Sequence, residues 1–276
     1  MFAEPGGKGS NQAIAAARLG ARVTLLVKLG RDVAGDEAIA LFEREGLTLV
    51  DSERSLRAST GAAFIMSDEE GENLIAVAPG ANSELSSSDA PEGIVEAGDV
   101  LLCQLECPEE VFIGLAQRAQ ASGVLTILNP APARELSRYA YQLATIITPN
   151  ESELEVLAGH PIGSEQEMRA AVDLIHDRGT HNVVVTLGAR GSFWSSEMGS
   201  GYVKAPKVRA IDTTGAGDAF NAGLAVALAT GLTLPDAVSR AVLSGSYCAT
   251  RRGVIDGLAR VEQLDREDQW FEATDS

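Results

Sequence analysis

Residues 212–218 read Asp-Thr-Thr-Gly-Ala-Gly-Asp and lead directly into the apolar stretch 219–228, Ala-Phe-Asn-Ala-Gly-Leu-Ala-Val-Ala-Leu. A glycine-rich turn that opens a helix leaves backbone N–H groups unpaired at the positive end of the helix dipole. Such amides attract an anion, most often a phosphate. Asp218 lies at the inner edge of the turn, where its carboxylate can take the proton of an attacking hydroxyl. The stretch therefore favours phosphoryl transfer. The alternative is that Asp218 is an acidic residue of the kind common in the first turn of helices.

Composition narrows the class of protein. The 276 residues include 22 Lys and Arg against 39 Asp and Glu, a net charge of −17, which argues against nucleic acid or an anionic membrane as a partner. Three cysteines make no disulfide framework, and the three histidines lack the spacing of zinc ligands. The sequence has no apolar run long enough to cross a bilayer and no signal peptide at its start. We expect a reduced, cytoplasmic protein.

Apolar strands alternate with amphipathic helices along the chain. From residue 100 this pattern predicts a mainly parallel sheet between two helical layers, a three-layer α/β/α sandwich. Strands are expected at 100–105, 125–129, 145–148 and 182–186, and helices at 109–122, 151–157, 164–178, 215–230 and 234–250. Upstream we expect a helix at 11–19 capped by Ser10, a strand at 23–29, a helix at 35–45 and a hairpin of 60–66 with 74–78.

The remaining polar motifs follow predicted strands or open predicted helices. Ligands on parallel sheets bind at the carboxyl ends of the strands, which is where residues 104–106, 129–130, 148–150 and 186–188 fall. At the start of the chain, residues 6–11 read Gly-Gly-Lys-Gly-Ser-Asn. The ammonium of Lys8 and the amide of Asn11 suit a polyhydroxylated ligand, although a glycine-rich helix cap explains the same residues.

Three further positions carry two interpretations each. Residues 150–153 could contact phosphate through a hydrated Mg²⁺, which takes only one or two protein carboxylates, or form a helix-capping box. The turn 186–191 has glycines that let a nucleotide lie close to the backbone, or is a generic turn. Glu106 could accept hydrogen bonds from sugar hydroxyls or be a solvated acid.

Together these segments resemble the ribokinase family of sugar and nucleoside kinases, the PfkB type. The matching segments occur in family order between about residues 6 and 260, and they are 6–13, 71–73, 79–82, 129–134, 148–151, 186–191 and 212–218. The segment 212–218 marks the family strongly, and 129–134 (Asn-Pro-Ala-Pro-Ala-Arg) beside the first loop indicates its ribose-phosphorylating branch. The resemblance implies a single ribokinase-like kinase domain over residues 1–276, with a small β lid that includes the hairpin at about 60–78.

The resemblance also implies an activity and its site. We expect ATP-dependent phosphorylation of D-ribose at its 5-hydroxyl, with ATP, Mg²⁺ and a monovalent K⁺ as cofactors. The alternatives are a kinase for another sugar or nucleoside, or a catalytically silent protein that binds sugar or nucleotide. The implied catalytic residues are Asp218 as base and Gly215, Ala216 and Gly217 as anion hole. The implied sugar contacts are Gly7, Lys8, Asn11, Glu106 and Asp218. The implied nucleotide contacts are Asn150, Thr186, Gly188, Gly191 and Gly217. The implied metal contacts are Glu153 for Mg²⁺ and Asp212, Thr214, Cys248, Arg251 and Gly253 for K⁺.

The sequence departs from the family pattern in two places. Residue 257 is glycine, where members of the family often supply a serine hydroxyl to the K⁺ ion, so a weaker dependence on K⁺ is expected. Members also carry a strand and an aspartate-bearing segment upstream of the first glycine-rich loop, and here that loop follows Met1 almost at once. We therefore expect an N-terminally incomplete domain that lacks a strand and part of the lid. In the family the lid often pairs two subunits, so a homodimer through the lid is also expected.

Overall fold

The computed structural model describes residues 6–50, 54–67 and 73–266. Its main sheet has six strands in the order β10-β9-β8-β7-β6-β5. The four strands from β5 to β8 pair in parallel, and β9 and β10 extend the sheet with antiparallel pairing. The strands are β5 (Val100–Cys103), β6 (Leu125–Leu128), β7 (Ile146–Ile147), β8 (Asn182–Thr186), β9 (Ser192–Ser196) and β10 (Gly199–Val203).

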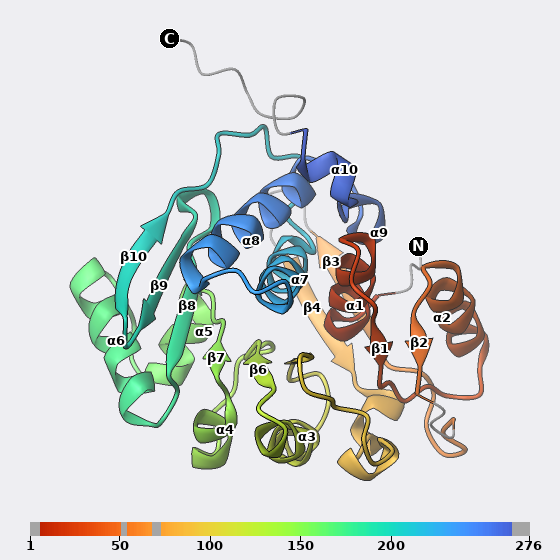
Figure 1. The fold of residues 1–276 in the computed structure, drawn as a ribbon. Coiled ribbons are helices and arrows are strands. Elements are labelled where there is room, and N and C mark those ends of the chain that lie inside the picture. Colours follow the sequence, from red (N-terminus) through yellow and green to blue (C-terminus); the bar gives the residue numbers. More distant parts are fainter. Residues whose placement is uncertain (1–5, 51–53, 68–72, 267–276) are drawn as a thin grey trace.

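Helices cover both faces of this sheet, as Figure 1 shows. One face is covered by α3 (Glu109–Ala121), α4 (Arg138–Leu143), α5 (Glu151–Ala158) and α6 (Glu165–Asp177). The other is covered by α7 (Ala216–Ala229) and α8 (Leu234–Ala249). The predicted three-layer α/β/α sandwich with a mainly parallel sheet is confirmed.

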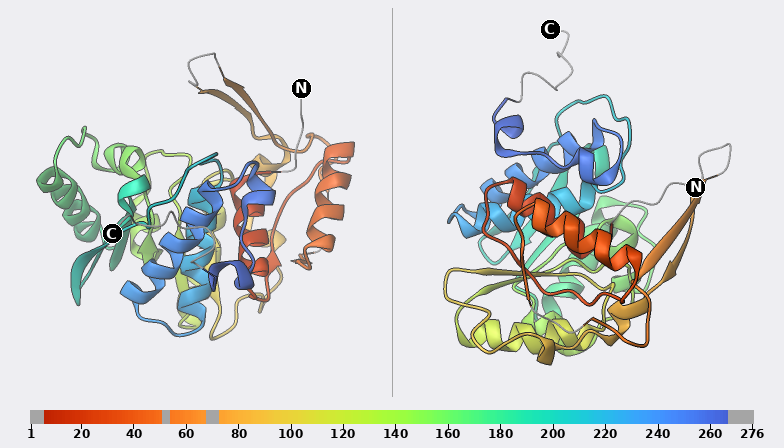
Figure 2. Two further views of the ribbon diagram at one scale, coloured as in Figure 1. Left: turned by 90° about the horizontal axis from the view of Figure 1, so that it is seen from above. Right: turned by 90° about the vertical axis from the view of Figure 1, so that its right-hand side faces the viewer.

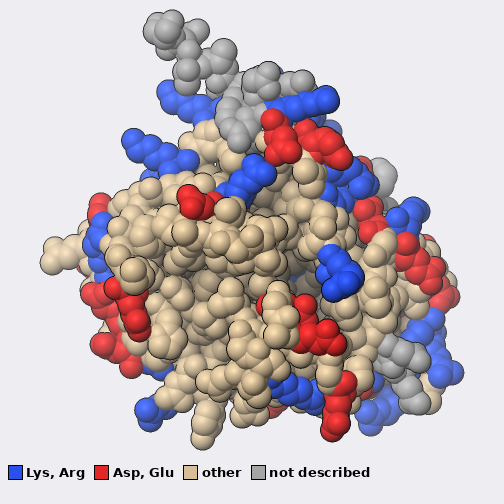
Figure 3. Space-filling model, in the orientation of Figure 1, with Lys and Arg blue, Asp and Glu red and all other residues tan. Residues whose placement is uncertain are grey.

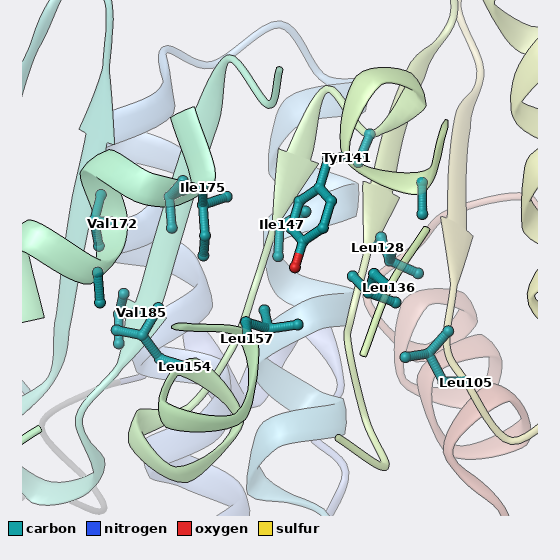
Figure 4. Packing of buried hydrophobic residues seen from close by; sticks show 14 of the residues in the cluster. Leu105, Leu128, Leu136, Tyr141, Ile147, Leu154, Leu157, Val172, Ile175 and Val185 are labelled. Atoms are coloured by element: carbon teal, nitrogen blue, oxygen red, sulfur yellow. The ribbon is translucent and has the colours of Figure 1, made fainter. Parts of the chain in front are cut away.

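Neighbouring residues of the central strands face opposite layers. Leu128 of β6 and Ile147 of β7 pack against α3 to α6, in the cluster drawn in Figure 4. The residues just before them, Ile127 and Ile146, pack against α7 and α8. All four are at most 2% exposed, which is why these strands read as continuous apolar runs in the sequence.

The N-terminal segment adds a layer beside α7. Ile14 of α1 (Lys8–Arg18) and Phe42 of α2 (Val33–Arg44) share a buried cluster with Ala222 of α7. A separate parallel pair joins β1 (Thr24–Leu25) to β2 (Thr48–Leu49). The antiparallel hairpin of β3 (Ala62–Ser67) and β4 (Asn73–Ala78) stands out from the body in both views of Figure 2. Its predicted tip, with most of the 71–73 motif, lies outside the described residues.

Short helices complete the described chain. Three are 3₁₀ helices, η1 (Gly80–Glu84), η2 (Ser87–Asp89) and η3 (Gly188–Arg190), and two are α-helical turns near the C-terminus, α9 (Val254–Gly257) and α10 (Val261–Leu264). In the described ranges, no helix combines the length and the apolar character that a membrane crossing needs. On the face drawn in Figure 3, described basic side chains are interspersed with acidic ones.

Two local predictions were wrong, and one hairpin was not predicted. Ser10 does not cap the first helix: α1 already begins at Lys8, and its N-cap is Gly7, whose φ of 99° suits glycine. The strand expected at 23–29 is only β1, because its backbone ladder to β2 ends after Leu25. The hairpin of β9 and β10 was not predicted, because its serines and glycines lack the strand-like alternation of apolar residues.

Candidate active site

The glycine-rich turn before α7 is built as a cradle for an anion. Gly215 is the N-cap of α7 with a φ of 82°, and a Cβ there would lie 2.8 Å from Cγ1 of Val254. No described residue accepts a hydrogen bond from the backbone N–H of Gly217 or Asp218. A Cβ at Gly217 would meet no atom within 4 Å, so the space beside its Cα is open. The N–H of Ala216, by contrast, already donates to the carbonyl of Thr213 at 3.1 Å.

Asp218 is a buried carboxylate held by two side-chain amides. It is 7% exposed, and it accepts hydrogen bonds from Nδ2 of Asn11 at 2.8 Å and from Nε2 of Gln12 at 2.9 Å. Burial raises the pKa of Asp218, and the ammonium of Lys8 and the two amide hydrogen bonds partly offset that rise. A carboxylate with a raised pKa beside unpaired amides is suited to accept a proton from an attacking hydroxyl.

The predicted sugar-binding residues converge on this carboxylate. The backbone N–H of Lys8 donates to Oε2 of Glu106 at 2.7 Å. Burial raises the pKa of Glu106, and the negative charge of Asp218 raises it further. The backbone hydrogen bond from Lys8 and the ammonium of Lys8 act in the opposite direction. A Cβ at Gly7 would lie 3.4 Å from the same carboxylate oxygen. The structure therefore brings the first loop, the end of β5 and the start of α7 together.

One atom next to Asp218 has no hydrogen-bond partner among the residues that the structure describes. Asn11 is 6% exposed, and its Oδ1 is a buried acceptor without a hydrogen bond among the described residues. Leaving such an atom unpaired costs free energy. A ligand could pair with it only after the atoms that cover it have moved.

The predicted nucleotide-binding residues lie at the ends of β7 and β8. An isolated parallel bridge joins Asn150 to Thr186. Asn150 also forms the predicted capping box with Glu153: its Oδ1 accepts from the N–H of Glu153 at 2.7 Å, and Oε2 of Glu153 accepts from the N–H of Asn150 at 2.9 Å. Burial raises the pKa of Glu153. The hydrogen bond from the backbone of Asn150 and the ammonium of Lys8 lower it in part.

The turn after β8 depends on two left-handed glycines, Gly188 with a φ of 56° and Gly191 with a φ of 95°. A Cβ at Gly191 would lie 1.9 Å from the carbonyl oxygen of Val203, so the turn packs closely on β10. At Gly188 a Cβ would meet nothing within 4 Å. Gly188 therefore borders open space in which a ligand could approach the backbone.

The residues predicted to hold K⁺ come from two segments that meet, the loop before α7 and the end of α8 with the residues that follow it. Oδ1 of Asp212 accepts from the N–H of Thr214 at 2.9 Å, and its Oδ2 accepts from the N–H of Gly253 at 3.1 Å. The Thr214 hydrogen bonds are the main reason that the pKa of Asp212 is lowered. The thiol of Cys248 contacts the Thr214 carbonyl at 3.7 Å, and the Cys248 carbonyl accepts from the N–H of Arg251 at 3.0 Å.

The donor sets suit weakly chelated ions. Within the described residues, no group of three or more His, Cys, Asp or Glu side chains could hold a metal. Mg²⁺ does not need such a group, because it keeps several waters and uses few protein carboxylates, so Glu153 fits it. K⁺ would take main-chain oxygens and the Asp212 carboxylate. At Gly257 a Cβ would lie 3.2 Å from Sγ of Cys248, so an added side chain would crowd that thiol.

Five buried or partly buried amide and hydroxyl side chains next to Asp218 were given no role from the sequence, although three of them belong to the strand-end motifs it singled out. They are Gln12, Gln104, Asn129, Thr148 and Asn221. The strands β5, β6 and β7 are directly followed by Gln104, Asn129 and Thr148. The apolar helices α1 and α7 contain the other two, Gln12 and Asn221. Polar residues at such positions were the available signal, because buried polar groups are generally hydrogen-bonded.

Comparison with known proteins agrees with this architecture. The model of the pfkB family carbohydrate kinases matches residues 3–260. Ribokinase of Haemophilus influenzae is 40% identical over 263 residues, which cover 94% of this chain and 86% of that protein. The crystal structure of ribokinase from Thermotoga maritima has a TM-score of 0.87 at 31% identity, and the match covers 96% of this chain and 88% of that one. The structure of Arabidopsis thaliana ribokinase complexed with ribose and ATP has a TM-score of 0.86 at 27% identity, covering 95% and 86%.

Fold and site together define a kinase that phosphorylates a small polyhydroxylated molecule. The chain belongs to the pfkB family of carbohydrate kinases.

Proposed function

We propose that the protein transfers the γ-phosphoryl group of ATP to the 5-hydroxyl of D-ribose, giving ribose 5-phosphate and ADP. One observation carries the proposal: the buried carboxylate of Asp218 lies in the same turn as the unpaired N–H groups at the start of α7. The similarity to ribokinases, including one solved with ribose and ATP, supports ribose as the acceptor.

In this proposal Asp218 is the general base. The sugar oxygen forms a bond to the γ-phosphorus while its proton passes to a carboxylate oxygen of Asp218, and the bond from that phosphorus to the leaving oxygen of ADP breaks. The unpaired amides of Gly217 and Asp218 stabilise the negative charge on the transferred group. Of the three predicted anion-hole residues, Ala216 is the least suited to this role, because its N–H already donates to the carbonyl of Thr213.

Sugar binding is assigned to the residues around Lys8. The partly buried carboxylate of Glu106 would accept hydrogen bonds from sugar hydroxyls. Asn11, which is hydrogen-bonded to Asp218, would lie beside the sugar, and its buried Oδ1 would pair with it only after the atoms that cover it have moved. An acceptor beside a base matches a ligand that carries several hydroxyl groups.

The nucleotide and ion contacts remain those that the sequence suggested. Asn150, Thr186, Gly188 and Gly191 would line the nucleotide site. Glu153 would hold hydrated Mg²⁺, and K⁺ would sit among Asp212, Thr214, Cys248, Arg251 and Gly253. When bound, these cations supply positive charge near the phosphates and behind the anion-binding turn.

We also propose a cytoplasmic enzyme that pairs through its lid. The three described thiols are free, which fits a reducing compartment. The hairpin of β3 and β4 stands away from the body, and Val77 on it is 57% exposed. Light scattering of a Val77→Lys variant tests the pairing: we expect a dimer for the parent and a shift toward monomer for the variant.

The experiment for the activity is a coupled ADP-release assay over a panel of sugars and nucleosides. D-Ribose should give the highest kcat/KM, and NMR of the product should place phosphate on the 5-oxygen. If another pentose, a hexose or a nucleoside is the preferred acceptor, the protein is still a kinase, but ribose is not its substrate. Binding of ribose and ATP without turnover of any acceptor would favour a silent binding protein and reject the proposal.

A further inference from the structure

Gln12 is the centre of a group of buried amides around Asp218. Its side chain is 1% exposed, and Nε2 donates to Oδ1 of Asp218 at 2.9 Å and to Oδ1 of Asn129 at 3.1 Å. Its Oε1 accepts a hydrogen bond from Nε2 of Gln104. Both N–H bonds and the carbonyl oxygen of this amide are therefore engaged.

The orientation of the Gln12 amide is set by its neighbours. An ionised carboxylate can only accept hydrogen bonds, so the NH₂ end must face Asp218. Gln104 supplies a donor at the opposite end and thereby holds the Gln12 oxygen away from the carboxylate. Gly9 of α1 leaves room for Gln104, since a Cβ at Gly9 would lie 2.9 Å from Oε1 of Gln104.

We infer that Gln12 is a positioning residue, which holds the Asp218 carboxylate in the orientation that accepts the proton of the sugar hydroxyl. The inference rests on the proposed function, because it concerns the same carboxylate. Gln12 fixes one oxygen and Asn11 the other. Each carboxylate oxygen has lone pairs left after accepting one such bond, so the proton still has a site to occupy.

The same group of side chains reaches the anion-binding turn. Nδ2 of Asn129 donates to the carbonyl of Thr148 at 3.2 Å, and Oγ1 of Thr148 donates to Oδ1 of Asn221 at 2.5 Å. Nδ2 of Asn221 then donates to the carbonyl of Gly217 at 2.9 Å. The base and the turn that would hold the phosphate are thus fixed to each other through the ends of β6 and β7.

Charged and titratable groups from four elements act on Asp218. They are Lys8 on α1, Glu106 after β5, Glu153 on α5 and Cys248 on α8. None of them is changed when Gln12 is replaced. Loss of the Gln12 donor removes a hydrogen bond that favours the ionised carboxylate, so Asp218 should keep its proton to higher pH.

The test compares Gln12→Met with the parent protein in steady-state kinetics across pH. Methionine has a similar length and no donor. We expect kcat near neutral pH to fall about 10- to 100-fold, the size of one hydrogen bond to a charged group. The loss should shrink as the pH rises, and the KM for ATP should stay within about two-fold.

The matched control is Thr148→Val, which breaks the bond to Asn221 but leaves both hydrogen bonds to Asp218. Its thermal unfolding reports the cost of losing a buried hydrogen bond in the same network. Its pH midpoint for kcat should equal that of the parent. An unchanged pH midpoint for Gln12→Met, with a loss of kcat no larger than that of Thr148→Val, would overturn the inference.

A second variant tests the inference if Gln12→Met does not fold. Gln104→Met frees the far end of the Gln12 amide, and it should move the pH midpoint in the same direction by a smaller amount. No movement in Gln104→Met would then reject the positioning role. The proposed function would be contradicted by a different result, normal turnover by Asp218→Asn.

Discussion

The side-chain amide of Asn11 donates a hydrogen bond of 2.8 Å to Oδ2 of Asp218, although 207 positions separate the two residues. The bond joins the first turn of α1 to the first turn of α7. It also leaves Oδ1 of Asn11 buried and unpaired among the described residues. Asn11 thus contacts the candidate base and carries an unsatisfied acceptor beside it.

Replacement of Asn11 should therefore impair sugar binding and turnover together. For Asn11→Ala we expect the KM for D-ribose to rise about 10-fold or more and kcat to fall, because a ligand contact and a bond to the base are both lost. The KM for ATP should change little. Asn182→Ala is the control, since Asn182 donates an amide hydrogen bond to the Thr145 carbonyl at the opposite end of the sheet. Equal effects of the two variants on the ribose KM would contradict this role of Asn11.

Replacing Asp218 with Asn should remove a pH-dependent contribution to the stability of the fold. Burial raises the pKa of Asp218 in the folded protein above the value of about 3.9 for an unfolded aspartate. Its contribution to stability is then full below the unfolded pKa and is lost as the pH rises through the folded pKa. Asn at this position does not titrate. The free energy of unfolding of Asp218→Asn, measured in urea from about pH 4 upward, should increase relative to that of the parent as the pH rises. Parallel curves over the whole range would refute this.

Activation by K⁺ should depend on the carboxylate of Asp212. This side chain accepts hydrogen bonds from Thr214 and Gly253, so its loss frees the loop behind the anion-binding turn. In Asp212→Ala we expect the increase in kcat/KM on adding K⁺ to disappear. Asp256→Ala removes an equal charge from the neighbouring helix α9 and should keep that increase. The assignment is wrong if both variants respond to K⁺ alike.

The two glycines of the turn after β8 should respond differently to alanine. Both have positive φ, which costs about 1 kcal/mol for a residue with a Cβ. Gly191→Ala also places a Cβ 1.9 Å from the Val203 carbonyl, so we expect it to lower stability by several kcal/mol. Gly188→Ala meets nothing and should cost only the backbone strain. Thermal unfolding of the two variants measures the difference, and equal midpoints would rule out the tight contact.

The sequence predicted the sandwich well, because strands buried on both faces leave continuous apolar runs such as 182–186, which β8 matches residue for residue. It also located the loops that meet beside Asp218, since the carboxyl ends of parallel strands lie at one edge. Ser10 was misjudged as a cap, because a glycine with positive φ can begin a helix without a side-chain bond.

The contacts of Gln12 could not be predicted from local patterns. Its partners Asn129 and Asp218 come from distant parts of the chain, and they meet only when β6 and α7 are packed in the observed register. The sequence indicated a base and an anion-binding turn at 212–218. It did not indicate which amides hold the base in place, because that depends on the tertiary structure.

The most direct test of the account is the turnover of Asp218→Asn with D-ribose and ATP, measured as ADP release beside ATP affinity from calorimetry. The account predicts that kcat falls about 10²- to 10⁴-fold, because the general base is gone, while the Kd for ATP stays within a few-fold of the parent. Near-normal turnover in a correctly folded variant would remove Asp218 from the mechanism and contradict the central claim.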